Sequence, residues 1–308
     1  MKITSSGHTC HLACGTDTRP GEDWATHFAR LRRHVAGVRA ATSSTTDDGE
    51  GDPGATFALT LRLTTVTLAE LEDGETLDRL RAWLDAERCH VVTLGAADPA
   101  PDDGSPPADD HVPDWSGALR LDYTRRLMTL LARLDPPDAR GSISTPLGLL
   151  GPRPTPEREA AMVENLLRAL AHGLALERDT GARVELALRP EPGTRLANAD
   201  AVVSFVEGRL LGTAGVQRMA ALTGLAASGA RQALHRHLGI CHDACRSAVE
   251  FESPLEALER YAASDIEVLK LELGSALHVR RVNEAALRRL QRFDEPRRLR
   301  RLFGRGHR

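Results

Sequence analysis

Lysine is almost absent from this sequence of 308 residues, and arginine supplies nearly all of the positive charge. The only lysines are Lys2 and Lys270, so the preference for arginine runs through the whole chain and a single arginine says little about function. A formal net charge of −3 gives no sign of the strongly basic surface that favours nucleic acid. We therefore expect no nucleic-acid partner.

Long apolar runs are missing as well. No run of about 18 apolar residues is present to span a bilayer, and the N-terminus has no apolar signal core. The sequence thus predicts a cytoplasmic protein that is not inserted into a membrane.

The five cysteines, an odd number in a chain of this length, argue against a framework of disulfide bonds. Cys10 and Cys14 are four residues apart, as are Cys241 and Cys245. Two such pairs could build a tetrahedral zinc site, but the spacing is not that of the usual short knuckle, and each pair includes a residue inside a predicted strand. We expect buried free thiols instead.

Strand-like segments alternate with helical sequence along the chain, and this alternation predicts a parallel sheet wrapped by helices. Seven strands are expected, at residues 10–15, 57–63, 90–94, 141–145, 183–188, 238–241 and 268–273. An eighth strand is missing, because the chain continues with a predicted helix at 279–293 and an arginine-rich tail from about residue 294. The expected fold class is α/β, a TIM-barrel-like single domain over residues 1–308 that is incomplete at its C-terminal end.

Helical spacing and capping residues predict the segments between the strands. Trp24, Phe28, Leu31, Val35 and Val38 give one apolar helix face. Further helices are expected at 119–134, 199–211 and 216–235, and loops at 42–54 and 98–113. Predicted helix starts are a capping box of Thr67 and Glu70, Thr155 followed by Pro156, and Ser253 followed by Pro254 with Glu256 closing a second box.

The stretch from 237 to 252, HLGICHDACRSAVEFE, carries the most chemistry. Its apolar start reads as a buried parallel strand that brings His242 and Asp243 to the strand's carboxyl end. Barrel enzymes keep their chemistry at that end.

Several stretches of the sequence carry a resemblance to known proteins: RPGEDW (19–24), VPDW (112–115), DYT (122–124), GSISTPLG (141–148), LALRPEPG (186–193), HLGICHDACRSAVEFE (237–252) and KLELGSAL (270–277). In the same order and spacing they resemble one family, the xylose-isomerase-like barrel proteins of ebo-type operons, which are called metabolite traffic proteins. More distantly they are similar to sugar isomerases/epimerases and metal-dependent apurinic endonucleases.

The resemblance implies a barrel with a pocket at the carboxyl ends of its strands, where members of the wider superfamily hold a divalent metal with Glu, Asp and His. Such ligands suit Mg, Mn or Zn. A metal there would polarise a carbonyl group or activate a water molecule.

This sequence departs from the family at the metal ligands. Arg189 stands where the family has the first Glu of Glu-Pro-Glu-Pro, and Arg246 stands where it has the His of Asp-x-x-His. Arg19 replaces a further His near the first strand, and residues 95–100 replace the family's Asn-Gly-Phe-Pro-Tyr-Gly. Asp243 is the only matching ligand.

A guanidinium group cannot ligate a cation and stays charged. We therefore expect no metal and no cofactor, with Mg, Mn or Zn as the alternative. The same arginines suit a carboxylate or a phosphate, so the expected partner is a small anionic metabolite bound in a positively charged pocket. The expected ligand-binding residues are Arg19, Arg189, Arg246, His242 and Lys270.

Two function classes remain open. The first is a non-catalytic or vestigial metabolite traffic protein of the ebo type, which leaves room for partner proteins from the same operon. The second is a divalent-metal-dependent sugar isomerase or epimerase with Asp243, Glu191 and Glu272 as its catalytic residues. A repair endonuclease ranks third, because the histidine-rich zinc constellation that it needs is absent.

Structural interpretations compete with these roles. Asp243 could be a helix cap or an arginine's partner, Glu272 could pair with Arg246 or Arg189, and His242 could point away from the barrel axis. An inward-facing Lys270 would need a counter-charge. The arginine-rich tail is expected to be a solvated helix end, with nucleic acid or anionic lipid as the alternative.

Overall fold

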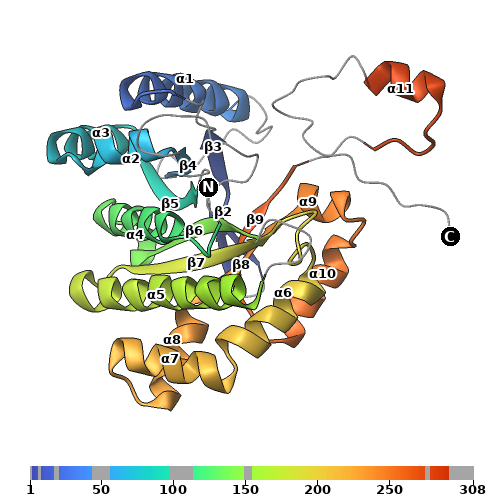
Figure 1. The fold of residues 1–308 in the computed structure, drawn as a ribbon. Helices are drawn as coiled ribbons and strands as arrows, with labels where there is room; N and C mark the ends of the chain where they lie inside the picture. Colours follow the sequence, from blue (N-terminus) through green and yellow to red (C-terminus); the bar gives the residue numbers. More distant parts are fainter. Residues whose placement is uncertain are drawn as a thin grey trace.

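Seven parallel strands form the main sheet, in the order in which they occur in the chain (Figure 1). The structure, a computed structural model, describes residues 2–5, 8–16, 21–43, 56–96, 114–148, 155–274 and 278–290. The strands are β3 (Ala13–Thr16), β4 (Phe57–Leu63), β5 (Cys89–Ala96), β6 (Arg140–Leu147), β7 (Arg183–Pro190), β8 (Leu238–Asp243) and β9 (Val268–Glu272). Each neighbouring pair is parallel.

Helices connect successive strands, as parallel pairing requires. They are α1 (Trp24–Ser43), α2 (Thr65–Glu72), α3 (Gly74–Ala86), α4 (Ala118–Arg133), the 3₁₀ turn η1 (Pro137–Ala139), α5 (Pro156–Thr180), α6 (Ala199–Phe205), the π-helical turn η2 (Val206–Leu210), α7 (Thr213–Thr223), α8 (Ala227–His237), α9 (Ala244–Val249) and α10 (Pro254–Ala263). A last helix, α11 (Glu284–Leu290), follows β9 and has no buried residue. The predicted α/β class with a parallel sheet is confirmed.

The sheet is curled, which a contact across its inner face makes clear. Lys270 Nζ on β9 lies 3.0 Å from Ser144 Oγ on β6, although β7 and β8 stand between these strands. Three strand spacings in a flat sheet would separate β6 from β9 by about 14 Å, farther than a lysine side chain reaches. The described residues contain no strand that joins β9 back to β3, so the sheet is a half-barrel, consistent with an incomplete TIM-like barrel.

Apolar side chains fill the space between the outer face of the sheet and the helices. On β7 the fully buried Val184, Leu186 and Leu188 face this layer, and the residues between them face the inside of the half-barrel. Helix α5 packs very close to β7: a Cβ atom added at Gly173 would lie 2.8 Å from the Val184 carbonyl oxygen. The helix ends at Gly181, whose φ of 77° is the left-handed conformation that glycine adopts without strain.

Two of the predicted helix starts are confirmed and one is wrong. Thr155 caps α5 and Ser253 caps α10, each by accepting a backbone N–H three residues later. The Glu256 side chain does not return a hydrogen bond, however, so the box predicted at Ser253 is not closed. The capping box predicted for Thr67 with Glu70 is instead formed by Thr64, whose side chain and backbone exchange hydrogen bonds with Thr67 at 3.2 and 2.8 Å. Since both candidate caps are threonines within one turn, the sequence pattern alone does not choose between them.

Several predicted elements are divided in the structure. The strand expected at 10–15 is two strands, because β2 (His8–His11) pairs with β1 (Lys2–Ser5) in a separate antiparallel sheet and only β3 joins the main one. The helix expected at 216–235 breaks at Gly224, where φ is 70°. Helix α9 was not predicted, and within 278–290 the expected last helix begins only at Glu284.

Other predictions lie outside the described residues. These are the loop at 98–113, all of the loop at 42–54 beyond the end of α1, and the arginine-rich tail. Among the helices of the described ranges, none combines the length and the apolar character that crossing a membrane demands.

Candidate functional site

Six charged side chains gather at the carboxyl ends of β7, β8 and β9, the end at which barrel enzymes carry their chemistry. We call them the strand-end cluster. Its members come from the ends of the three strands, from the residue after β7 and from the first turn of α9: Arg189, Glu191, Asp243, Arg246, Lys270 and Glu272.

Glu272 is the centre of one half of the cluster. Its Oε1 lies 2.8 Å from Lys270 Nζ and its Oε2 lies 3.3 Å from Arg189 Nη1. Burial opposes the charge of Glu272, but Lys270 and Arg189 outweigh it and lower the pKa of the carboxyl group to about 2. The expectations that Lys270 has a counter-charge and that Glu272 pairs with Arg189 are confirmed.

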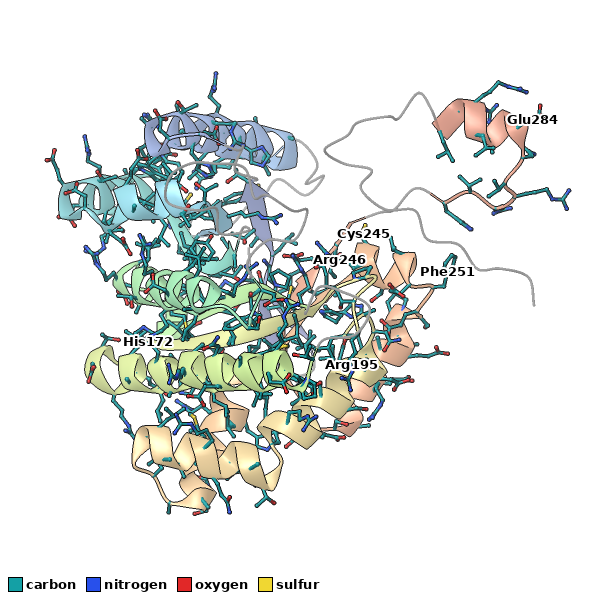
Figure 2. The ribbon with its side chains drawn as sticks, viewed as in Figure 1. His172, Arg195, Cys245, Arg246, Phe251 and Glu284 are labelled. Atoms are coloured by element: carbon teal, nitrogen blue, oxygen red, sulfur yellow. The ribbon has the colours of Figure 1, made fainter. Side chains whose placement is uncertain are left out.

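Arg246 is the centre of the other half. Its Nε lies 3.1 Å from Asp243 Oδ2, and its Nη1 contacts Glu191 Oε1. Asp243 Oδ1 also accepts the backbone N–H groups of Cys245 and Arg246, at 3.0 and 3.2 Å, and thereby caps α9. Figure 2 shows Cys245 and Arg246 on this helix. Asp243 is therefore both a helix cap and an arginine's partner.

The charges of the strand-end cluster balance. Three cations face three carboxylates, so the six side chains together carry no net charge. The balance is uneven in space, however: the Glu272 half has one surplus positive charge and the Arg246 half has one surplus negative charge. The predicted excess of positive charge thus depends on Arg19, which lies outside the described residues.

The residues at this end do not fit a divalent metal. Each carboxylate of the strand-end cluster is ion-paired with a lysine or arginine side chain, which cannot ligate a metal. Within the described part of the chain, no three His, Cys, Asp or Glu side chains come together in a way that could hold a metal ion. The absence of a metal from the protein remains a prediction.

His242 does not join the strand-end cluster. Its ring is buried and packs edge to face against Tyr261 of α10, with the ring centroids 6.1 Å apart. Alternation along β8 requires this, because His242 and Asp243 face opposite sides of the sheet. Burial lowers the pKa of His242, and Nε2 has no hydrogen-bond partner within the described residues. The side chain belongs to the helical layer.

The inward-facing positions of two residues, Ser144 and Cys241, were not predicted. Ser144 contacts Lys270, as noted above, and Cys241 is fully buried beside the Glu272 half of the cluster. Burial, followed by the nearby charge of Glu272, raises the pKa of the Cys241 thiol to about 12, so that it is neutral. Period-two alternation with Asp243 along β8 was the signal that could have found the inward position of Cys241.

The cysteines are all free, as expected, but only Cys89 and Cys241 are buried. Cys14 and Cys245 are half-buried and Cys10 is exposed.

No protein-family model matches the sequence, and a search of curated proteins finds no match either. Solved structures with a partial likeness include a xylose isomerase domain protein from Planctomyces limnophilus (16% identity, 70% of this chain and 62% of that one, TM-score 0.46). They also include an L-ribulose 3-epimerase (14%, 85% and 81%, TM-score 0.45) and a 3-keto-D-glucoside 4-epimerase from E. coli (12%, 77% and 87%, TM-score 0.39). The chain spans about three fifths of the first of these structures. Strand order and curl define it as an α/β half-barrel with an ion-paired strand-end cluster.

Proposed function

We propose that this chain binds a small anionic polyhydroxy metabolite at the strand-end cluster, and that ion pairs there take the place of a divalent metal. One observation supports this above all: Glu272 is held between Lys270 and Arg189, so that cations stand where metal ligands would have to converge. In this reading the protein handles a metabolite without transforming it, as a metabolite traffic protein of the ebo type would.

The uneven charge of the cluster supports a particular kind of ligand. The surplus positive charge of Lys270 and Arg189 suits a carboxylate or phosphate group. The surplus negative charge around Arg246 suits hydroxyl groups, because the oxygens of Glu191 and Asp243 accept hydrogen bonds. Sugar acids and sugar phosphates carry both features. Glu272, Glu191 and Arg246 are each partly exposed. Lys270 and Arg189 are largely buried, so a ligand reaches these two cations past Glu272.

Thermal stabilisation by gluconate and glucose 6-phosphate, with sorbitol and glucose as neutral counterparts, tests the ligand class. A ligand that binds only the folded state raises the unfolding midpoint, and we expect the two anions to raise it more than the neutral compounds. Lys270→Met should remove this preference. Greater stabilisation by sorbitol or glucose would contradict the proposal.

A second candidate function is a metal-dependent sugar isomerase or epimerase. It is favoured by the position of Glu191, Asp243 and Glu272, which are carboxylates at the ends of three adjoining strands. This function requires Arg189 and Arg246 to leave the carboxylates that they now contact.

Titration calorimetry with Mn²⁺ separates the two functions. We expect no stoichiometric binding by the wild-type protein or by Arg189→Glu and Arg246→His singly, and a gain of affinity when both changes are combined, because three ligands then act on one ion. Arg218→His, which adds an imidazole to the exposed side of α7, is the matched control. Tight binding by the wild type would favour the second function.

A further inference from the structure

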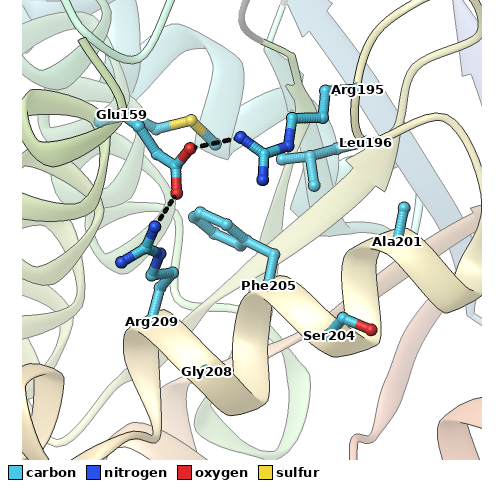
Figure 3. A pocket seen from close by; sticks show the side chains of 9 residues that line it. Glu159, Arg195, Leu196, Ala201, Ser204, Phe205, Gly208 and Arg209 are labelled. Carbon is cyan, nitrogen blue, oxygen red and sulfur yellow. Dashed lines mark hydrogen bonds and ion pairs between the residues drawn. The ribbon is translucent and has the colours of Figure 1, made fainter. Parts of the chain in front are cut away.

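A cavity of about 450 Å³ lies in the helical layer, and its lining includes no member of the strand-end cluster. It opens between the first turns of α5, the loop after β7, and the continuous segment of α6 and η2 (Figure 3). Its volume falls within the range of about 300–1,000 Å³ that is usual for ligand sites. Neither the predicted nor the proposed function accounts for it.

Two arginines share one carboxylate at the cavity's edge. Glu159 Oε2 lies 2.7 Å from Arg195 Nη1, and Oε1 lies 2.6 Å from Arg209 Nη2. The three groups leave one surplus positive charge. The carboxylate is largely buried, with 12% of its side chain exposed, whereas Arg195 and Arg209 are 62% and 58% exposed. Each guanidinium uses a single nitrogen for Glu159 and has no other acceptor within the described part of the chain, so N–H donors remain for a second anion.

The rest of the lining is mainly apolar. Met162 of α5, Leu196 of the loop and Phe205 of α6 are buried side chains that reach the cavity. Figure 3 shows the Phe205 ring pointing toward the Glu159 carboxylate and its two arginines. An ion-paired edge beside an apolar wall is the pattern that recognises an amphiphile: a few polar groups orient the ligand and apolar side chains bury its body.

The π-helical turn contributes to this arrangement. In η2 the backbone N–H of Leu211 bonds to the carbonyl oxygen of Val206, five residues earlier, at 2.8 Å. Such turns often occur at functional sites. Here the turn carries Gly208 and Arg209, both of which line the cavity.

We propose that the cavity binds a small molecule with one carboxylate and a short apolar body. The carboxylate accepts hydrogen bonds from Arg195 and Arg209 and neutralises their surplus charge, and the body packs against Met162, Leu196 and Phe205. Planar guanidinium groups suit a carboxylate particularly well, because they donate parallel N–H bonds.

Ligand-observed NMR titration with hexanoate, acetate and 1-hexanol tests this pairing of features. Hexanoate carries both the carboxylate and the apolar body, whereas acetate and 1-hexanol each carry one of them. We expect hexanoate to bind at least about tenfold more tightly than either, a difference of about 1.4 kcal/mol. The double change Arg195→Gln with Arg209→Gln should weaken hexanoate binding by about tenfold and leave 1-hexanol binding unchanged.

A second cavity variant and a control allow the proposal to be tested even if the double change alters folding. Gly208→Leu adds bulk at the lining without removing a charge, and a Cβ atom there meets nothing within 4 Å. It should abolish hexanoate binding without lowering the unfolding midpoint. Arg218→Gln is the matched control, since Arg218 pairs with Glu164 of the same helix α5 but does not line the cavity.

The proposal is overturned if the wild type does not bind hexanoate, or if it binds acetate or 1-hexanol equally well. It is also overturned if the cavity variants bind hexanoate as tightly as the Arg218→Gln control does. If Lys270→Met lost hexanoate binding while the cavity variants kept it, hexanoate would bind at the strand-end cluster, and the cavity site would be refuted.

Discussion

The two ends of the parallel strands both carry an ion pair with one buried partner, Arg189 at the carboxyl end and Glu185 at the amino end. The pKa values of the carboxyl groups at the two ends nevertheless shift in opposite directions. At the carboxyl end, Lys270 and Arg189 hold the pKa of Glu272 at about 2. At the amino end, Arg140 donates to Glu185 at 2.7 and 3.0 Å, yet burial raises the pKa of Glu185 in spite of this contact.

Burial explains most of the difference. The Glu185 side chain is 3% exposed and that of Glu272 is 30% exposed, and for Glu185 desolvation outweighs both nearby cations, Arg140 and Arg183. Arg140 also donates to Glu267, at 2.6 Å, so Glu185 shares its main partner with a second negative charge. Glu272 has two close cations to itself. In barrel enzymes the carboxyl end carries function and the amino end carries stability. Here the carboxylate at the carboxyl end is charged and paired with two cations, which would have to be displaced before a metal ion could bind it.

The largest expected effect on stability comes from replacing Glu272 and Glu185, one at a time, with the neutral glutamine. Glu272→Gln should lower the free energy of unfolding by about 3 kcal/mol, because Arg189 is buried and has no other acceptor among the described residues. Glu185→Gln should leave it unchanged or raise it, because the raised folded pKa makes the charge of Glu185 unfavourable in the fold and Arg140 keeps Glu267. Urea unfolding at pH 7 measures both. A larger loss of unfolding free energy in Glu185→Gln than in Glu272→Gln would contradict this difference between the two ends.

The pH dependence of the same variants sharpens this comparison. The folded pKa of Glu272, about 2, lies below the unfolded value near 4.5, so its stabilisation is present above pH 4.5 and is lost as the pH falls toward 2. Wild type and Glu272→Gln should therefore converge at pH 2 and separate by on the order of 3 kcal/mol above pH 5. The folded pKa of Glu185 is raised, so its charge destabilises the fold as the pH rises through that pKa.

Stability curves for the three proteins between pH 2 and pH 7 check both signs. The stability of wild type relative to Glu185→Gln should fall with rising pH, whereas its stability relative to Glu272→Gln should rise. If both stability differences changed with pH in the same direction, the pKa values of Glu272 and Glu185 would be shifted in the same direction, which would contradict the comparison.

Sequence alone placed most of the cluster and left its pairing undecided. Strand ends follow from hydrophobic runs, and thus Arg189, Asp243 and Glu272 were expected at one end of one sheet. Whether Glu272 would contact Arg189 or Arg246 depends on how side chains reach across neighbouring strands, which spacing along the chain does not encode. Ser144 was missed for the same reason, because its contact with Lys270 exists only in a curled sheet.

Local signals failed where an element is short or where competing signals are close together. Helix α9 has only six residues, too few for a 3.6-residue period to be recognised. A single glycine, Gly224, ends α7, and an isolated glycine in a helical pattern is equally compatible with a continuous helix. The cavity at Glu159 could not be predicted either, because its two arginines lie 36 and 50 residues away along the chain and meet only through helix packing.

The smallest expected effect separates the two roles of Asp243 at the carboxyl end. Asp243→Ala removes the cap of α9 and one contact of Arg246, which retains Glu191, and should lower the free energy of unfolding by about 1 kcal/mol. Asparagine is an equally good cap, so Asp243→Asn should cost only a few tenths of a kcal/mol. Urea unfolding measures both. If asparagine costs as much as alanine, the negative charge of Asp243 matters more than its cap. The Arg246 half of the cluster would then be held together by charge, as the Glu272 half is.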